Sequence, residues 1–332
     1  MNDFQYIKNN YINRNKWNEC VSKSINSRVY GLSWYLDIVC KNWDGIVFGD
    51  YEAVFPVVFK NFFFLKKSYH PLFCQQLGLF YKNSFNKILE EGFVKYLHKN
   101  ILPKYFKKYI YCATSEFSNL LDNKARCSRM QIVDSDTKIY FTKHASMIGA
   151  FATTRNNLQI DLRNNYIDIK NGYNKNTIRN LKKSSRFNLR IKKEISIDVF
   201  MDLYKTNKKI ATSIQTPISF KNYNYLIIKN LISTSLRKKR GRLIGVYNRE
   251  NNIVSAAFFL SCFKREIILF NVTKPNSMHY HSMTFLIDYF INYNCKEDKV
   301  LDFEGSNIEG VRNFYAGFGS LNNQYYAIKN FY

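Results

Sequence analysis

The stretch LDFEGSNIEGVRNFYAGFGS, residues 301–320, begins in a short apolar strand that carries two acidic residues. A glycine and a short helix follow, and the helix ends at Tyr-Ala-Gly-Phe-Gly. The strand is expected to bury its apolar members, so Asp302 and Glu304 need water, a basic side chain or a substrate beside them. Alternation along a strand puts both carboxyl groups on one face, where two neighbouring acids share a proton and one pKa rises. At least one of them is therefore a candidate general base.

Upstream of this stretch, the spacing of apolar residues indicates a succession of helices and strands. Residues 278–295 carry apolar side chains at helical spacing, and residues 243–247, 253–262 and 266–272 read as three strands joined by polar turns. Residues 198–210 and 221–236 predict two helices before those strands, and residues 325–328 a last strand. The order of helix, helix, three strands, helix, strand, helix and strand predicts an α/β fold with a mixed sheet.

The first half of the chain repeats this order in looser form. Residues 17–25 and 33–40 predict helices, and two strands follow that are joined at Gly49-Asp50, a pair suited to a tight turn. Pro56 lies within the second of these strands and indicates an edge or a bulge there. A helix at 86–99 and a strand at 109–113 complete the unit, and residues 142–157, which lack periodicity, read as a linker. We therefore expect two tandem domains, 1–155 and 156–332, each a twisted mixed sheet flanked by helices.

The charge balance is strongly basic. Fifty Lys and Arg against 25 Asp and Glu give a formal net charge of +25, which attracts nucleic acid, anionic lipid or phosphorylated substrates. The abundant Lys, Asn, Ile, Tyr and Phe are also the amino acids of A/T-rich codons. Mutational bias and a functional basic surface both remain open as explanations of the charge.

Several classes of protein are disfavoured by the sequence. The longest apolar run, residues 253–263, is well short of the ~18 residues that span a bilayer, and the first residues do not resemble a signal peptide, so we expect a cytoplasmic protein. The seven cysteines are scattered and form no C-x-x-C pair, which argues against a disulfide framework or a zinc site. His279 and His281 do not share a helix face, so we expect no metal.

Four segments in order resemble one family. They are WDGIVFGDYEAVFPVVFK (residues 43–60), HPLFCQQLGLF (70–80), LQIDLRNNYIDIKNGYNKNTIRNLKKSSRFNLRIKK (158–193) and the opening stretch. Together they resemble the GNAT superfamily of N-acetyltransferases in its doubled form, the Fem-type peptidoglycan aminoacyl transferases, and in particular uncharacterised members from Bacteroidetes. The likeness covers most of the chain from about Trp17 onward and implies two tandem GNAT-like subdomains, the second of them catalytic.

The resemblance implies where an acyl donor binds. In this fold two strands, here 266–272 and 300–303, splay apart and leave backbone groups for an ester or thioester, while a helix start receives the donor's phosphates. The matching positions are Asn271, Val272, Thr273, Lys274, Asn276 and Ser277. The glycine-rich loop usual in acetyltransferases is absent from TKPNSMHYHSM, residues 273–283. Acyl-CoA, aminoacyl-tRNA and an acyl-carrier protein therefore all remain possible donors.

Tyr315 is the candidate acid. Acetyltransferases often place a tyrosine at this offset from the final glycine, where it protonates the leaving thiolate, whereas Fem-type enzymes have a lysine there. The other explanation is that Tyr315 packs in the core beside Phe314 and Phe318. Glu304 has a plain alternative too, because it can pair with Arg312 or interact with the start of the next helix.

The acceptor is expected to contact both halves of the chain. Trp34, Tyr35, Gln75 and Gln76 are the candidates in the first half, although packing explains the aromatic residues equally well. Arg179 and Lys183 share a helix face and suit an anionic acceptor or a tRNA backbone, or else form a solvated surface.

These residues predict an N-acyltransferase that uses direct attack by an amine, with no metal and no covalent intermediate, because no nucleophile motif is present. The acceptor is then a small molecule or a cell-wall precursor. The alternatives are a Fem-type transferase that uses aminoacyl-tRNA, and a catalytically inert protein that binds RNA or an anionic surface. The oligomeric state is left open.

Overall fold

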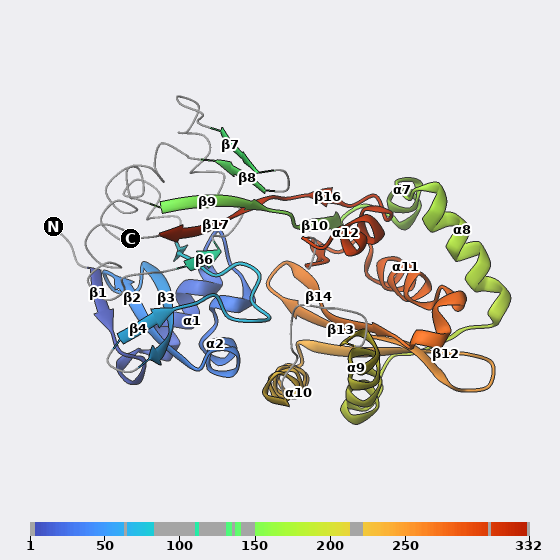
Figure 1. Ribbon diagram of the computed structural model, residues 1–332, viewed down its shortest axis with the longest axis horizontal. Helices are drawn as coiled ribbons and strands as arrows, with labels where there is room; N and C mark the ends of the chain where they lie inside the picture. Colours follow the sequence, from blue (N-terminus) through green and yellow to red (C-terminus); the bar gives the residue numbers. More distant parts are fainter. Residues whose placement is uncertain are drawn as a thin grey trace. The chain divides into compact units, whose positions relative to one another are not determined.

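The computed structural model describes residues 4–62, 65–82, 110–112, 131–134, 137–140, 150–212, 222–304 and 307–330 (Figure 1). The chain divides into two compact units, 1–156 with 323–332, and 157–322. Within the described ranges, no helix has both the length and the apolar character that crossing a membrane requires.

The first unit begins with a sheet covered by two helices. Its order is β1-β2-β3-β4, and β5 pairs with the start of β3. Pro56 lies where β3 has no described partner on one side, because β5 covers Ala53 and Val54 while β4 ends opposite Phe59, and this confirms the local edge. The elements are β1 (Phe4–Ile7), α1 (Arg14–Lys23), α2 (Ser33–Val39), β2 (Asn42–Phe48), β3 (Ala53–Phe62), β4 (Leu65–Ser68) and β5 (Phe80–Tyr81), with 3-10 turns η1 (Asn9–Tyr11) and η2 (Val29–Gly31).

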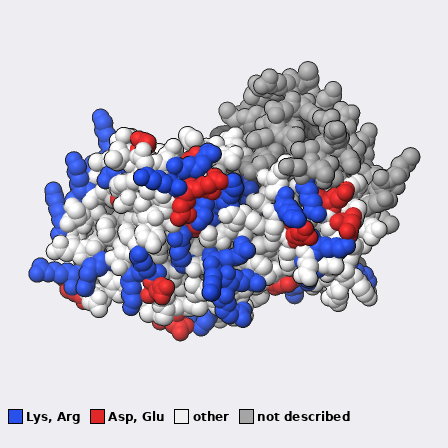
Figure 2. Space-filling model, turned by 180° about the vertical axis from the view of Figure 1, so that it is seen from behind, with Lys and Arg blue, Asp and Glu red and all other residues white. Residues whose placement is uncertain are grey.

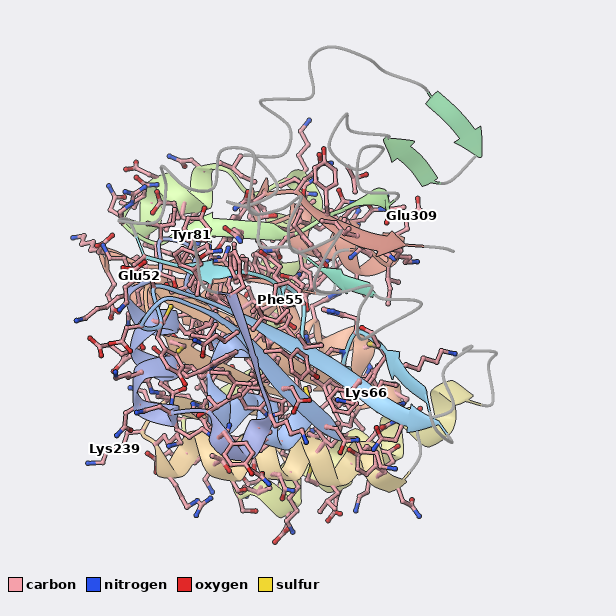
Figure 3. All side chains as sticks on the ribbon, turned by 90° about the vertical axis from the view of Figure 1, so that its left-hand side faces the viewer. Glu52, Phe55, Lys66, Tyr81, Lys239 and Glu309 are labelled. Carbon is pink, nitrogen blue, oxygen red and sulfur yellow. The ribbon has the colours of Figure 1, made fainter. Side chains whose placement is uncertain are left out.

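A buried acid ties three of these strands together. The Tyr6 hydroxyl donates to Asp44 Oδ2 at 2.6 Å, and Lys66 Nζ lies 3.2 Å from the same oxygen. Lys66 reaches inward from the edge strand β4, where Figure 3 labels it. A carboxylate that is 6% exposed is thus both hydrogen-bonded and paired, as buried charge requires.

The first unit also holds a sheet that the last strand of the chain completes. Its order is β6-β17-β9-β8-β7, with β17 antiparallel to both β9 and β6. The predicted second domain, 156–332, included this strand, whereas its backbone partners place it in the first unit. The predicted linker 142–157 contains β9, whose sequence AFATTR lacks the alternation that marks a strand. The predicted helix 86–99 lies outside the described residues. The strands are β6 (Ile110–Cys112), β7 (Gln131–Asp134), β8 (Thr137–Tyr140), β9 (Ala150–Arg155) and β17 (Tyr325–Asn330).

The second unit is built on one mixed sheet of seven strands, in the order β11-β12-β13-β14-β15-β10-β16. All neighbours are antiparallel except β14 and β15, which run parallel. The strands are β10 (Leu158–Asp161), β11 (Arg190–Lys192), β12 (Gly241–Tyr247), β13 (Ile253–Cys262), β14 (Arg265–Thr273), β15 (Val300–Asp302) and β16 (Leu321–Asn322).

Helices cover both faces of this sheet (Figure 1). Helix α11 packs on β12, β13 and β14 and on α8, while α9 and α10 pack on each other and on β14 and β12 respectively. The apolar face predicted for residues 278–295 is buried in the core of the unit through Leu286, Ile287, Phe290 and Ile291. The helices are α7 (Tyr166–Asn171), α8 (Lys175–Ser184), α9 (Ile197–Thr212), α10 (Asn222–Arg237), α11 (Ser282–Asn294) and α12 (Glu309–Ala316), with 3-10 turns η5 (Ser185–Phe187) and η6 (Pro275–Tyr280).

The parallel pair β14 and β15 is short. Only Arg265, Glu266 and Ile267 pair with β15, opposite Val300, Leu301 and Asp302. The register of β14 against β13 then shifts between Phe270 and Ile268, which marks a β-bulge at Leu269. A bulge bends its strand and strengthens the local twist, so β14 departs from the line of β15 just after their last paired residues.

Steric constraints explain the glycine at position 319, at the end of the stretch 301–320. Gly319 has φ +72°, a conformation that favours glycine, and a Cβ there would lie 2.6 Å from the backbone oxygen of Gly172. The end of α12 therefore approaches the end of α7 backbone to backbone. Nearby, the amide of Asn174 donates to the carbonyl of Gly317 at 2.9 Å, which ties α12 to the start of α8.

We expect Gly319→Ala to lower the free energy of unfolding by about 1–3 kcal/mol, because it adds both backbone strain and a clash with a backbone atom. Gly310→Ala is the matched control, since a Cβ at that position in the first turn of α12 meets nothing within 4 Å. The control is expected to be neutral or to stabilise by up to about 1 kcal/mol. Chemical denaturation measures both, and equal effects would contradict the close approach.

Candidate functional site

The open side of β14 presents backbone groups beyond its last pairing with β15. Lys274 N–H donates to the Val254 carbonyl of β13. Because backbone direction alternates along a strand, the backbone N–H and C=O groups of Val272 and Phe270 also point toward β13. Asn271 and Thr273 therefore direct their backbone groups to the other side. The Thr273 carbonyl is capped there by the Asn207 side chain at 2.7 Å, whereas the two N–H groups lie on the side where the described residues supply no strand.

Tyr315 lies next to this part of β14. The Asn271 side-chain amide donates to the Tyr315 hydroxyl oxygen at 2.7 Å, and the ring stacks on Phe303 with centroids 4.5 Å apart. Tyr315 is 4% exposed, so the predicted core packing is present. Its hydroxyl nevertheless reaches the edge of β14. Because the oxygen accepts from Asn271, the phenolic hydrogen is directed to another acceptor.

The acidity of Tyr315 follows from its surroundings. Burial raises the pKa of Tyr315 to about 12, the hydrogen bond from Asn271 opposes that rise, and the nearby negative charge of Glu304 adds to it. The group is therefore a neutral phenol across the physiological range. A phenol that keeps its proton is suited to donate it to a leaving group.

Glu304 turns away from the path of the strand. Strand β15 ends at Asp302, and Glu304 has φ +46°, in the left-handed region, so the predicted alternation that put both acids on one face is wrong. Burial of its carboxyl raises the pKa of Glu304 well above the ordinary value. Of the two acids, Glu304 is the one whose raised pKa suits a general base.

Asp302 has a different set of neighbours. Its Oδ2 lies 3.0 Å from Arg265 Nη1 and accepts from Asn157 and Gln159 side chains at 3.2 and 3.3 Å. Its Oδ1 accepts from the backbone N–H of Glu304 at 3.2 Å. At 2% exposure this carboxylate is a buried, fully engaged anion, and it anchors the end of β15 instead of facing a substrate.

The start of α11 is the polar end of the site. Ser255 bridges the Thr273 hydroxyl at 3.0 Å and the hydroxyl of Ser282, the first residue of the helix. His281 precedes the helix with φ +50°. Lys274 and Asn276 are exposed, whereas Ser277 is buried. The first N–H groups of a helix and its dipole favour anions, so this end of the site attracts negative charge.

The basic residues of α8 lie near this helix start. The pKa of His281 is lowered first by its burial and then by the positive charges of Lys183 and Arg179, with His279 adding to them. Phe187, just after α8, packs edge-on against Tyr280 with ring centroids 4.9 Å apart. Arg179 and Lys183, which the sequence assigned to an acceptor, therefore lie beside the predicted donor end.

The four first-half candidates lie in the first unit. Tyr35 is fully buried and its hydroxyl donates to the Phe73 carbonyl, so it is a core residue there. Gln76 is also fully buried and donates to Gln75 at 3.0 Å. Trp34 and Gln75 are partly exposed, and Trp34 packs edge-on against Tyr35. Of the four, Trp34 and Gln75 retain surface for a ligand.

The partner that fixes Asp302 is absent from the sequence-based prediction. A buried Asp302 requires a cation, and Arg265, which supplies it, begins the strand that pairs with β15. The hydroxyl bridge through Ser255 was also missed, because nothing in an apolar strand marks one serine as facing a helix start.

Basic side chains are widely distributed. Figure 2 shows Lys and Arg spread over the face it draws, with fewer Asp and Glu among them. In the described residues, no three His, Cys, Asp or Glu side chains come together as metal ligands.

Comparison with known proteins gives structural likeness alone. No protein-family model matches the sequence, and no curated protein matches it. The chain is similar to a crystal structure of FemX, with TM-score 0.60 and 9% identity over 95% of this chain and 96% of that one. It is equally similar to a conserved protein of unknown function from Bacteroides thetaiotaomicron, with TM-score 0.60 and 12% identity over 99% of both chains. The C-terminal domain (DUF2156) of a putative lysylphosphatidylglycerol synthetase from Agrobacterium fabrum matches with TM-score 0.53 and 10% identity, over 96% of this chain and 92% of that one.

The chain therefore shares its fold with FemX and with these two other structures over nearly its whole length. The predicted α/β class with mixed sheets is confirmed.

Glu304→Gln is expected to change how stability depends on pH. A carboxyl whose folded pKa lies above its unfolded value stabilises the fold fully below the unfolded pKa, and this contribution is lost as pH rises through the folded pKa. Starting from the ordinary value of 4.5, the wild type should thus lose stability relative to Glu304→Gln as pH increases. Unfolding free energies of both proteins, measured by chemical denaturation at steps of about one pH unit from pH 4 to pH 9, test this expectation.

Glu309→Gln is the matched control, since Glu309 is an exposed acid of α12 that Figure 3 labels. A profile for Glu304→Gln with the same shape as that of Glu309→Gln would contradict a buried carboxyl of raised pKa.

Proposed function

We propose that the second unit transfers an acyl group from an ester or thioester donor to an amine. The observation that carries the proposal is the meeting of Asn271, Tyr315 and Glu304 where β14 leaves β15. A proton-holding phenol, a carboxyl of raised pKa and two outward backbone N–H groups come together there. The Fem/GNAT-like fold supports acyl transfer as the kind of reaction.

The reaction needs two proton transfers and no covalent intermediate. The acceptor nitrogen attacks the acyl carbonyl carbon, Glu304 takes the proton from that nitrogen, and the new C–N bond forms. As the bond to the donor's sulfur or oxygen breaks, the Tyr315 hydroxyl gives its proton to the departing atom. Asn271 acts by orienting Tyr315, because its amide occupies the oxygen and directs the hydrogen outward.

The donor lies along the open side of β14. Backbone N–H groups of Asn271 and Thr273 bind its carbonyl oxygens and stabilise the charge that develops there. Val272 faces β13 and supports the strand only. Phosphate groups of the donor bind at the start of α11, near Lys274, Asn276 and Ser277, with Arg179 and Lys183 contributing positive charge from α8.

Two donors are compatible with this site. Acyl-CoA fits a tyrosine acid that protonates a thiolate, and an acyl-carrier thioester shares that chemistry. Aminoacyl-tRNA is the second candidate, favoured by the likeness to FemX and by the net charge of +25. The acceptor is an amine on a small molecule or a cell-wall precursor.

Donor binding should depend on the charges of α8. Arg179→Gln and Lys183→Gln are each expected to weaken binding of acetyl-CoA or of aminoacyl-tRNA about three- to tenfold, because each removes one cation near the phosphates. Lys182→Gln, an exposed lysine of the same helix, is the control. The acetyl-CoA arm is measured as an increase in melting temperature, and the tRNA arm as salt-dependent filter binding.

The inert RNA-binding alternative would be favoured if the protein bound tRNA with the same affinity with and without its aminoacyl group and showed no acyl transfer. Equal losses in Lys182→Gln and Lys183→Gln would contradict a phosphate site at α11.

Tyr315→Phe is expected to lower turnover by about 10²–10⁴-fold with little change in donor affinity, because a general acid acts in the transition state. The comparison uses single-turnover acyl transfer to a panel of amines. Tyr289→Phe, a partly buried tyrosine of α11, is the control for loss of a hydroxyl. Turnover that survives in Tyr315→Phe would remove the leaving-group role.

A further inference from the structure

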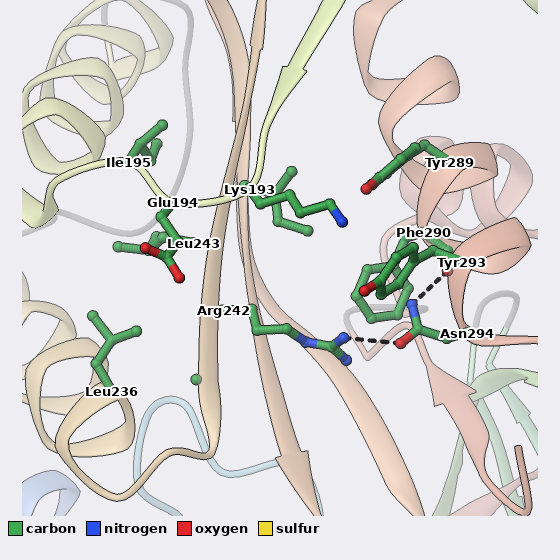
Figure 4. A pocket seen from close by; sticks show the side chains of 12 residues that line it. Lys193, Glu194, Ile195, Leu236, Arg242, Leu243, Tyr289, Phe290, Tyr293 and Asn294 are labelled. Atoms are coloured by element: carbon green, nitrogen blue, oxygen red, sulfur yellow. Dashed lines mark hydrogen bonds between the residues drawn. The ribbon is translucent and has the colours of Figure 1, made fainter.

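A cavity of about 380 Å³ lies at the far end of α11 from the candidate acyl-transfer site. Its walls are the connection from β11 to α9, the first residues of β12, and the last two turns of α11 (Figure 4). None of its lining residues takes part in the site described above. This size falls within the range of ~300–1,000 Å³ that is usual for small-molecule pockets.

The cavity occurs where the edge of β12 is left open. The β11–β12 ladder stops at Gly245, while β12 continues back to Gly241. Ser261 N–H donates to the Arg240 carbonyl, so alternate residues Gly241 and Leu243 direct their backbone away from β13. The Leu243 carbonyl accepts from Ile195 at 3.3 Å, but no strand of the described chain pairs with the Leu243 N–H. An open edge of this kind presents donors to a ligand.

Two cationic side chains line the cavity, and only one of them forms an ion pair with a described residue. Arg242 lies with its Nη2 2.7 Å from Glu266 and donates from Nη1 to Asn294 at 2.9 Å, so its charge is already balanced. Lys193 is exposed and forms no ion pair with a described carboxylate; its Nζ lies 4.2 Å from the ring centroid of Tyr293. Among the described residues, the Lys193 ammonium group is thus the one at this cavity that forms no ion pair.

The remaining walls are mostly aromatic and aliphatic, and Glu194 adds a carboxyl group on the side of Leu243, away from Lys193 and α11 (Figure 4). Tyr289 and Tyr293 stack with centroids 6.0 Å apart, and Tyr293 is 59% exposed despite its large apolar ring. Figure 4 shows Lys193 and Arg242 extending toward α11, with Leu236 and Leu243 on the other side of the strand. Exposed aromatic surface beside an uncompensated cation is suited to a ligand with a flat apolar body and an anionic head.

We propose that this cavity binds a small aromatic anion, a carboxylate or a phosphate ester, whose charge is held by Lys193 and whose body lies against Tyr293 and the β12 edge. The Leu243 N–H supplies a backbone donor to the same head group. The site is separate from the donor site, because Ser282 and Tyr293 are eleven residues apart on α11, roughly 16 Å along a helix.

The proposal is tested by calorimetric titration of the full chain with three matched probes: benzoate, phenyl phosphate and the neutral benzamide. Saturable binding of at least one anion, about tenfold tighter than benzamide, is expected, since one charge interaction of this size is worth about that factor. Benzoate alone would assign a carboxylate ligand, and phenyl phosphate alone a phosphate ester. Benzamide that binds as tightly as both anions, or no saturable binding of either anion, would overturn the proposal.

Variants locate the binding. Lys193→Gln is expected to lower affinity for the anion about tenfold and to leave benzamide unchanged, whereas Lys192→Gln, the neighbouring exposed lysine outside the cavity, should leave both unchanged. Tyr293→Ala should weaken both kinds of probe, and because Tyr293 is largely exposed the fold is expected to tolerate it. Arg179→Gln should have no effect. An anion whose affinity falls in Arg179→Gln and not in Lys193→Gln is bound at the start of α11, and the proposed cavity is then not its site.

Discussion

The three-residue ladder between β14 and β15 is the constraint on which the second unit depends, and buried ion pairs hold it. Asp302 pairs with Arg265, and Glu266, which is fully buried, pairs with Arg242 at 2.7 Å and Lys299 at 3.0 Å. Removing one partner from a buried pair typically costs 3–5 kcal/mol, roughly the size of a marginal domain's stability. The ladder is therefore closed at its base by charge, and the bulge at Leu269 then turns β14 away from β15.

The same arrangement explains why Tyr315 reaches β14. Helix α12 is fixed at its end by the backbone contact between Gly319 and Gly172 and by the bond from Asn174 to Gly317. Phe303 follows directly after the ladder and stacks on the Tyr315 ring, so the strand and the helix position the phenol together. Burial explains the raised pKa, and one amide from Asn271 sets the direction of the hydroxyl. Core packing and a role as general acid are thus compatible for Tyr315, because the packing holds the phenol beside β14.

Periodicity predicted the elements that bury apolar side chains on one face, such as α11 and β13, and the order of those elements predicted the fold. It failed where long-range pairing decides the outcome. Strand β9 has no alternation, and β17 leaves the unit that precedes it to join β9. It failed again at Glu304, because a single left-handed residue ends the alternation and no local signal marks that residue when it is not glycine or asparagine. The partner of Asp302 has no local signal for a related reason, since the cation that neutralises it lies 37 residues away in the sequence.

The two ends of the α11–β14 layer have opposite electrostatic character, and this bears on whether sites at both ends act independently. The positive helix start is linked to Thr273 through the hydroxyls of Ser255 and Ser282, while Lys193 and Arg242 lie at the negative helix end, where cations are stabilised. The ends are roughly 16 Å apart by the rise of the helix, beyond a Debye length of about 8 Å at physiological salt. Direct charge interaction between the ends is therefore weak. Glu266 connects the two regions by charge, because it contacts Arg242 at the cavity and Lys299 at the base of the β14–β15 ladder. A buried carboxylate shared between two cations transmits a change only if one of those contacts breaks, so the structure favours independent binding at the two ends over graded coupling.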